Sequence, residues 1–384
     1  MKKLAYFIFI LPLAFSCSVD QSNESSLPVD TSIVFYDDLR LDALTLPEGF
    51  RIDVFARVKD ARSLAVSPDG TVFVGSRGGG HVHAFKDENG DYKADKKYVI
   101  ATGRNNPNGI AFRDGDLYVS EVSKLWKYPN ILAFDTTQKE LIVDDYPTEV
   151  HHGKRYLGFG PDGKLYMPVG APCNICEKED QIYASITRMN PDGSEREIVA
   201  HGVRNTVGFD WHPQTGVFYF TDNGRDMMGD TTPECELNRL TEAGQHFGYP
   251  YCHQGNISDP EFGSKFPCED FVSPIELLGP HVAPLGMRFY TGTQFPETYR
   301  GEIFVALHGS WNRSPEAGHT GAQVILVREE GGESQGKEVF IDGFLMKSNN
   351  QYWGRPVDMI FLEDGSMLLS DDMSGTIYRV WYEG

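Results

Sequence analysis

The chain has little cysteine, few basic residues for its length and only one long hydrophobic run. Lysine and arginine number 35 against 55 aspartate and glutamate residues, which gives a formal charge of −20. Because phosphate binding needs a basic face, this balance argues against nucleic acid as a partner. Beyond the N-terminus no apolar run is long enough to span a bilayer. What the sequence does have is 40 glycines, which fits an all-β chain full of turns.

The long hydrophobic run lies at the N-terminus. Met1-Lys2-Lys3 precedes the apolar residues 4–15, and Ser16-Cys17 follows them. This is the layout of a secretory signal that ends at a lipidated cysteine. An ordinary signal peptide cut nearby is the alternative, because Ala14 stands where lipoprotein signals prefer Leu.

The next stretch is polar and rich in Ser and Asp, with too little apolar content to pack by itself. We therefore expect a lipoprotein signal peptide at 1–16, a flexible tether at 17–40 and a folded domain at 41–384. The protein is then exported, as a periplasmic or cell-surface lipoprotein whose contact with a membrane is the lipid on Cys17.

A unit of two strand-like runs joined by a tight turn occurs six times. In the first copy, Leu64–Val66 and Val72–Val74 flank Asp69-Gly70. Such a turn is a strong hairpin signal, because Gly accepts the positive φ that it needs. The turn glycines of the six copies step by 45, 48, 53, 85 and 64 residues. The first three intervals match four-stranded blades, so the sequence predicts an all-β, six-bladed β-propeller with an insertion in its second half.

A polar or charged residue stands just before the first run of each unit. These residues are Arg62, Asn108, His152, Arg204 with Asn205, His281 and Arg355. If the first runs line the channel, their leading ends share one face of the disc. Any one of them alone is more often a solvated loop residue. Together they form a cationic cup, and because buried cations without a counter-ion are costly, they favour an anionic ligand.

Five cysteines remain after Cys17. Cys252 and Cys268 close a loop in the long insertion, which a disulfide would hold together. Cys173 and Cys176 are open to three interpretations: a disulfide, a thiol redox pair or half of a metal site. We favour the disulfide, because no thioredoxin-like context, second CxxC or following His is present. Cys235 has no obvious mate.

At this point the residues resemble a known family, the soluble quinoprotein glucose/sorbosone dehydrogenases that use pyrroloquinoline quinone (PQQ), and in particular its sorbosone-type branch. The resemblance spans roughly residues 46–382 and is specific as a set. The segments that carry it are His152–Gly163, Gly202–Pro213 with Thr221–Arg225, Glu236–Asn238 with Phe247–Pro250, His281–Gly286, His308–Arg313, and Gly354–Asp358 with Ser370–Asp372.

The resemblance implies a general base at His152. In the family, a His at this distance before the Pro-Asp-Gly turn takes the proton from the anomeric hydroxyl while hydride leaves the C1 atom of the sugar for the quinone. An imidazole suits this role because it can accept and release a proton near neutrality. His151 stands where better-studied members carry Asp, and a neutral ring cannot orient His152 as a carboxylate would.

The resemblance also implies the residues that bind the cofactor. PQQ carries three carboxylates, and a guanidinium engages a carboxylate with two parallel hydrogen bonds. His308 and Arg313 would take over the work of a Lys in the glucose-oxidising relatives. The expected cofactor-binding residues, including the two from the repeat alone, are Arg204, Asn205, Arg355, Asp371, Asn108, His281, His308 and Arg313.

Relatives also hold Ca²⁺, and the resemblance places its ligands in two segments. One ion would lie against the quinone beside Gly224 and Arg225, and a structural ion would be bound by Glu236 and the carbonyl of Phe247. Relatives usually have an acidic residue where Cys235 stands. A further calcium-like string, at 87–95, lacks the Gly and the final Glu of an EF-hand loop, and we interpret it as a solvated hairpin tip.

The leading hypothesis is PQQ-dependent oxidation of an aldose or sugar aldehyde to its lactone or acid, with electrons passed to a respiratory acceptor. One alternative is a propeller of lactonase type, which hydrolyses sugar lactones with a Ca²⁺ or Zn²⁺ ion in the channel. Another is a non-catalytic propeller that binds glycan or protein through the insertion at 238–280. Fold alone does not decide among them.

Overall fold

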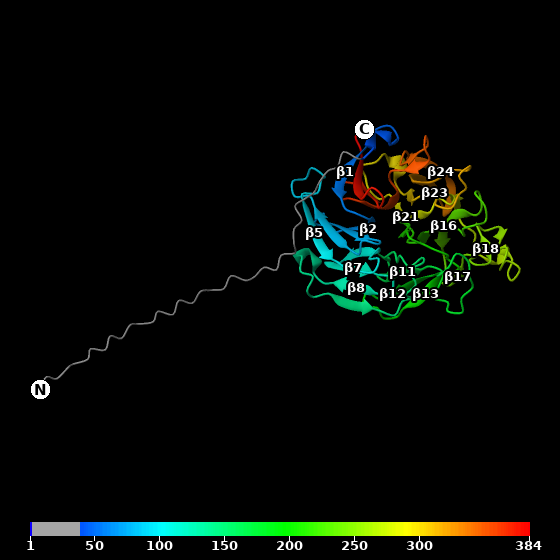
Figure 1. Cartoon of the computed structure of the whole chain (residues 1–384), viewed down its shortest axis with the longest axis horizontal. Helices are drawn as coiled ribbons and strands as arrows, with labels where there is room; N and C mark the ends of the chain where they lie inside the picture. Colours follow the sequence, from blue (N-terminus) through cyan, green and yellow to red (C-terminus); the bar gives the residue numbers. More distant parts are fainter. Residues whose placement is uncertain (2–38) are drawn as a thin grey trace.

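Six antiparallel sheets surround a common axis, in the order of the sequence (Figure 1). The computed structural model describes Met1 and residues 39–384. The expected signal peptide, Cys17 and nearly all of the expected tether therefore lie outside the described residues. The expectation of an all-β, six-bladed propeller is confirmed.

Each blade has four strands, which follow one another from the axis outward. Blades 1 to 3 consist of β2 (Ala61–Val66), β3 (Val72–Ser76), β4 (Val82–Lys86) and β5 (Lys96–Ala101); β6 (Ile110–Arg113), β7 (Asp116–Ser120), β8 (Leu125–Tyr128) and β9 (Glu140–Val143); and β10 (Gly158–Phe159), β11 (Leu165–Val169), β12 (Ser185–Met189) and β13 (Glu197–His201).

The second half of the chain forms three more blades. Blades 4 to 6 consist of β14 (Phe209–Trp211), β15 (Phe218–Asp222), β16 (Glu234–Leu240) and β20 (Glu276–Pro280); β21 (Pro284–Phe289), β22 (Ile303–Leu307), β23 (Gln323–Glu330) and β24 (Glu333–Ile341); and β27 (Pro356–Phe361), β28 (Met367–Asp371), β29 (Thr376–Tyr382) and β1 (Phe50–Arg57).

The last blade combines both ends of the described chain. Strand β1 pairs with β29 in antiparallel register, from Phe50 opposite Tyr382 to Arg57 opposite Thr376. Figure 1 shows the blue β1 beside the red C-terminal strand. The N-terminal strand thus supplies the outer edge of blade 6 and closes the ring.

The second strand of each blade explains why the short apolar runs of the sequence are so regular. All five residues of β3, β11, β15, β22 and β28 are buried, because a neighbouring blade covers each of their faces. Near the axis the backbones approach closely. A Cβ atom on Gly208 would lie 2.0 Å from the carbonyl oxygen of Leu285, so only glycine fits between blades 4 and 5 at this point.

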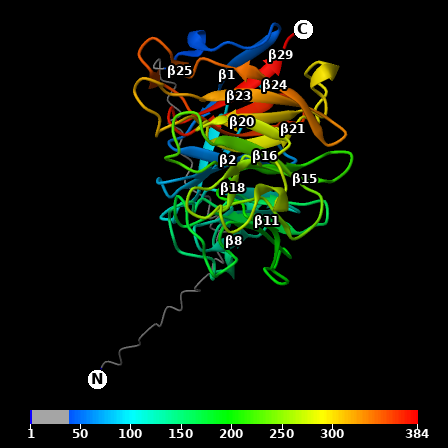
Figure 2. The same ribbon diagram turned by 90° about the vertical axis from the view of Figure 1, so that its right-hand side faces the viewer.

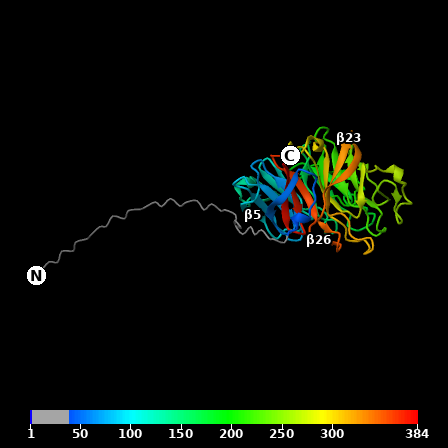
Figure 3. The ribbon, with the colours of Figure 1, turned by 90° about the horizontal axis from the view of Figure 1, so that it is seen from above.

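The insertion of blade 4 runs along the outside of the disc. Its short strand β17 (Gln245–His246) pairs in parallel with β13, and β18 (Cys252–His253) pairs with β19 (Ile257–Ser258). Figure 3 shows this yellow-green segment at the rim, and Figure 2 views the disc from that side. The insertion therefore contacts blade 3 as well as its own blade.

Both expected disulfides are present. Cys252 is bonded to Cys268 within the insertion, and Cys173 to Cys176 in the loop between β11 and β12. Cys235 is buried, and it is the free cysteine of the described residues.

The other regular elements are short. They are the hairpin of β25 (Leu345–Met346) and β26 (Gln351–Tyr352), and four 3-10 turns, η1 (Leu41–Ala43), η2 (Ile131–Ala133), η3 (Cys268–Asp270) and η4 (Glu297–Tyr299). In the part of the chain that the structure describes, no helix has the length and apolar character needed to cross a membrane.

Candidate functional site

His152 lies in the loop that enters β10, with a positive φ of 49°. Its Nδ1 atom is 2.8 Å from the carbonyl oxygen of Ala171, at the end of β11. A carbonyl oxygen only accepts, so Nδ1 carries the proton and Nε2 keeps its lone pair. The ring of His151 lies 4.0 Å away, centroid to centroid. The backbone carbonyl of Ala171 thus orients the His152 ring.

The imidazole of His152 is uncharged at neutral pH. Burial lowers its pKa to about 2, and the positive charge of Arg204 adds to the effect. Without a bound anion the ring therefore stays uncharged. An anion placed beside it would raise its pKa and make it a stronger base.

Arg204 lies in the loop before β14, and its side chain connects this loop with the loops that contain Asn174 and Asp226. We call the region that these loops form with His152 the mouth. It donates from Nε and Nη2 to the carbonyl and side-chain oxygens of Asn174, at 2.9 and 2.8 Å. Its Nη1 donates to the carbonyl of Asn223 at 3.1 Å, and Nη2 pairs with Asp226 at 2.9 Å. Most of its N–H groups are thus engaged by the protein.

Asn205 follows Arg204. The backbone N–H groups of Arg204 and Asn205 both donate to the carboxylate of Asp222. The side-chain amide of Asn205 has no hydrogen-bond partner among residues 39–384, and this leaves it available to a ligand.

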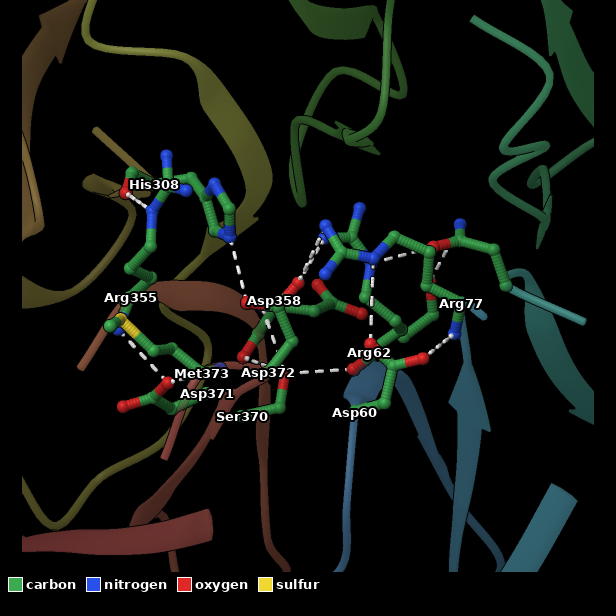
Figure 4. A network of polar contacts seen from close by, with 12 residues as sticks. Asp60, Arg62, Arg77, His308, Arg355, Asp358, Ser370, Asp371, Asp372 and Met373 are labelled. Carbon is green, nitrogen blue, oxygen red and sulfur yellow. Dashed lines mark hydrogen bonds and ion pairs between the residues drawn. The ribbon is translucent and has the colours of Figure 1, made fainter. Parts of the chain in front are cut away.

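Figure 4 shows a second part of the mouth, centred on Asp372. Asp372 accepts from His308 Nε2 at 2.8 Å and from Arg62 Nη1 at 3.0 Å, and it lies 3.5 Å from Arg77 Nη1. Burial lowers the pKa of His308 to about 4, although Asp372 opposes the shift. Arg355 donates from Nε and Nη2 to the carbonyls of His308 and Gly309. Its Nη1 group has no partner in this network.

Other expected cofactor residues have structural partners. The carboxylate of Asp371 accepts from the backbone N–H groups of Arg355, Met373 and Ser374, and so shapes the turn before β29. The side chain of Asn108 is fully buried, accepts from Arg62 and donates to the carbonyl of Arg155. Whether Asp371 or Asn108 also contacts a ligand stays a prediction.

His281 and Arg313 lie further out around the mouth. His281 Nε2 is 2.7 Å from the carbonyl oxygen of Gly229. The Nε atom of Arg313 is buried without a hydrogen-bond partner. An unsatisfied buried donor is costly, and a ligand oxygen would satisfy it.

The expected metal residues meet at one small cavity, which Gly224, Arg225, Glu236 and Phe247 all line. Glu236 lies opposite Asp222 in the β15–β16 pairing. Burial raises the pKa of Glu236 to about 8, and the charge of Asp222 contributes. Two buried carboxylates side by side fit a cation.

The donor set of this cavity is small. Arg225 is paired with Asp259 and Glu261. Within the described ranges, no group of three or more His, Cys, Asp or Glu side chains could hold a metal ion. A bound ion would therefore depend largely on backbone carbonyls.

The hydrogen bonds join the main expected residues in two groups. His152 connects to Arg204 through Ala171, whose N–H donates to the Arg204 carbonyl, while Arg355 and His308 share the Asp372 cluster.

Four residues of the mouth were not expected as site residues from the sequence. They are Asp372, Arg77, Asp226 and Lys154. Asp372, Arg77 and Asp226 stand in loops that follow strands rather than lead them, so the repeat does not mark them. Lys154 lies two residues after His152, and its nearness to the expected base was the signal that could have found it.

Three comparisons place the chain among known proteins. A family model described as TrAA12-like matches residues 44–383. An uncharacterized protein of Borreliella burgdorferi is 36% identical and the alignment covers 88% of this chain and 91% of that protein. The pyrroloquinoline quinone-dependent pyranose dehydrogenase of Coprinopsis cinerea is 24% identical over 88% of this chain, which spans 54% of that enzyme's length.

A solved structure shares the fold. The calcium structure of a Trichoderma reesei family AA12 enzyme superposes with a TM-score of 0.77 at 18% identity, over 88% of this chain and 97% of that one. Because the family model covers most of the sequence, the expected relationship to the PQQ-dependent sugar dehydrogenases, a class of oxidoreductases, is confirmed. The chain belongs to the TrAA12-like family.

Proposed function

We propose that the protein oxidises the anomeric carbon of an aldose or sugar aldehyde with PQQ as the cofactor. The observation that carries the proposal is His152, a half-buried and uncharged imidazole whose Nδ1–H is held by the Ala171 carbonyl beside Arg204. Such a ring offers Nε2 as a general base.

His152 Nε2 would accept the proton of the anomeric hydroxyl, and the C–O bond then becomes a carbonyl as hydride leaves C1. When bound, the quinone accepts that hydride, so a pyranose yields its lactone. Burial, with the charge of Arg204, keeps His152 uncharged before the sugar arrives, and the Ala171 carbonyl stabilises the ring once it carries the proton.

The donors around the mouth fit a polyanionic cofactor. The free Nη1 of Arg355, the orphaned Nε of Arg313 and the free amide of Asn205 are available to carboxylate or carbonyl oxygens. Arg204 would hold the group mainly through its charge, since most of its N–H groups are engaged.

Calcium belongs to the same proposal. The cavity at Glu236 and Gly224 lies directly behind Arg204, which lines it as well. A cation there would neutralise Glu236 and Asp222 and add positive charge below the mouth.

The cellular setting is proposed from the sequence alone. Residues 1–17 indicate export and a lipid on Cys17, and electrons from the sugar would then pass to a respiratory acceptor near the membrane.

The test is reconstitution of the purified protein with PQQ and Ca²⁺, followed by dye reduction with a panel of aldoses. His152→Gln should lower kcat/KM by about 100-fold or more, because a positioned general base contributes that much. Calorimetric binding of PQQ should persist. His212→Gln, which alters a His far from the mouth that pairs with Glu329, is the matched control.

Undiminished dye reduction by His152→Gln would contradict the mechanism. Hydrolysis of sugar lactones in the absence of quinone would instead support the lactonase alternative.

A further inference from the structure

A second pocket opens beside the mouth, between blades 6 and 1. It has a volume of about 680 Å³ and is lined by Lys59, Asp60, Arg77, Asp372 and Ser374, among others. This volume lies in the range of about 300–1,000 Å³ that is usual for small-molecule sites. Asp372 and Arg77 also belong to the cluster of Figure 4, so the pocket adjoins the candidate active site.

The two acids of the pocket are already neutralised by the protein. Asp60 accepts from the backbone N–H groups of Arg77 and Gly79 at 3.0 and 2.9 Å. Asp372 is bound by His308 and Arg62, as described above. Arg77 contacts both carboxylates, at 3.4 Å from Asp60 and 3.5 Å from Asp372.

The cations of this region outnumber those acids. Lys59 lies at the pocket lip and is exposed. Lys154 is half-buried, two residues after His152. Neither lysine makes a hydrogen bond or ion pair with any residue in the described part of the chain. The pocket lining itself holds four basic residues, Arg57, Lys59, Arg77 and Lys97, against the carboxylates of Asp60 and Asp372, on a chain of net charge −20.

Lys154 connects the pocket with the catalytic base. The charges that act on it most strongly are those of Arg62, Arg77, Asp372 and Asp60, which are residues of the pocket wall and of the adjoining cluster. Its own charge also acts on His152. Burial and the two arginines lower the pKa of Lys154 to about 8, so it remains mostly protonated at neutral pH and lacks a counter-ion.

We propose that this pocket binds the carboxylate of an acidic sugar unit, with Arg77 and Lys59 of the pocket wall and Lys154 of the adjoining cluster as its recognition groups. The substrate class is then a uronate-containing saccharide whose neutral reducing end lies at His152. The inference rests on the proposed function only for that orientation. A carboxylate in the pocket would give Lys154 and Lys59 the partner that the protein does not provide.

The test measures binding to quinone-free protein by calorimetry at low salt. The probes are cellobiouronate, in which glucuronic acid is linked to glucose, and its neutral match cellobiose. Because charged hydrogen bonds contribute about 1.5–3 kcal/mol, we expect cellobiouronate to bind about tenfold more tightly or better. The preference should shrink as salt is added.

Lys154→Met should reduce the preference to about twofold or less, and Lys59→Met should reduce it in part. Lys139→Met is the control, since it removes the same charge from an exposed position next to β9. PQQ affinity is measured separately for Lys154→Met, and the preference for the acid should fall whether or not that affinity changes.

The outcomes separate this inference from the proposed function. Equal affinities for the two disaccharides would overturn the pocket assignment, even if the enzyme oxidises both. Loss of PQQ affinity in Lys154→Met with an intact preference for the acid would make Lys154 a cofactor ligand and also overturn it. If the preference depends on Lys154 but no sugar is oxidised, the pocket assignment stands and the proposed oxidation fails.

Discussion

Glu236 shows how one buried side chain couples protonation to stability. Its pKa is raised from 4.5 to about 8, so the folded protein keeps a proton that the unfolded chain releases within this window. The free energy of unfolding therefore falls as pH rises from about 4.5 to 8, by about 1.4 kcal/mol for each pKa unit at most. Asp222, raised to about 6, acts in the same direction at lower pH.

We expect the apo protein to melt at a higher temperature at pH 5 than at pH 8, and we expect Glu236→Gln to remove much of that difference. Thermal unfolding monitored by circular dichroism at both pH values checks this. Glu140→Gln, at an exposed position of β9, should keep the wild-type pH dependence. Calcium should raise the melting temperature at pH 8 in the wild type but not in Glu236→Gln. An unaltered pH dependence in Glu236→Gln would show that other groups dominate.

At the residue scale, the repeat marks the leading residues of the inner strands, and their roles in a ligand site stay predictions. His152, Arg204 and Arg355 could be found because the repeat marks equivalent positions, and equivalent positions meet at the axis. Asp372 was not predicted because its partner Arg62 lies 310 positions away in the sequence, and no local pattern encodes such a contact. The engagement of Arg204 by Asn174 likewise depends on a loop conformation that spacing does not reveal.

Among the elements, the loop between β11 and β12 has the most direct effect on the site. The Cys173–Cys176 disulfide encloses Asn174, whose two oxygens both accept from Arg204. Tyr249 of the insertion supports the loop by accepting from the Cys176 N–H at 3.0 Å. The disulfide thus fixes a cation of the mouth through a residue that lies between its cysteines.

A double variant, Cys173→Ser with Cys176→Ser, should lower PQQ affinity several-fold while changing the stability of the fold little, because so short a closed loop removes little chain entropy. Calorimetry with PQQ and urea unfolding measure the two effects. Asn174→Ala should reproduce the loss of affinity with the disulfide intact. Unchanged affinity in both variants would show that Arg204 keeps its position without the loop.

Six hairpins and one insertion were predictable at this scale, whereas the closing strand was not. Strand β1 lacks the tight turn that marks the repeats, and its partner β29 is at the other end of the chain. The path of the insertion along blade 3 also depends on the long-range pairing of β17 with β13. Such pairings leave no periodic signal in the sequence.

For the whole molecule, stability depends on closure between blades 6 and 1. Ile377 of β29 is fully buried in the cluster that joins these blades and lies opposite Ala56 of β1. Ile377→Ala should cost about 2–5 kcal/mol of unfolding free energy, as deletion of a buried aliphatic side chain usually does. Leu141→Ala, at a 44% exposed position, should cost less than about 0.5 kcal/mol.

Urea unfolding of both variants measures this difference. Equal and small costs would show that the ring does not depend on the contact between these two blades.

The pairing of β1 with β29 also determines when the ring can close during synthesis of the chain. Strand β1 is the first of the described strands to be synthesised and β29 is the last. Blade 6 can therefore be completed only after the whole domain has been synthesised. Native contacts between such distant segments form slowly. Closure of the ring is therefore expected to be a late step of folding.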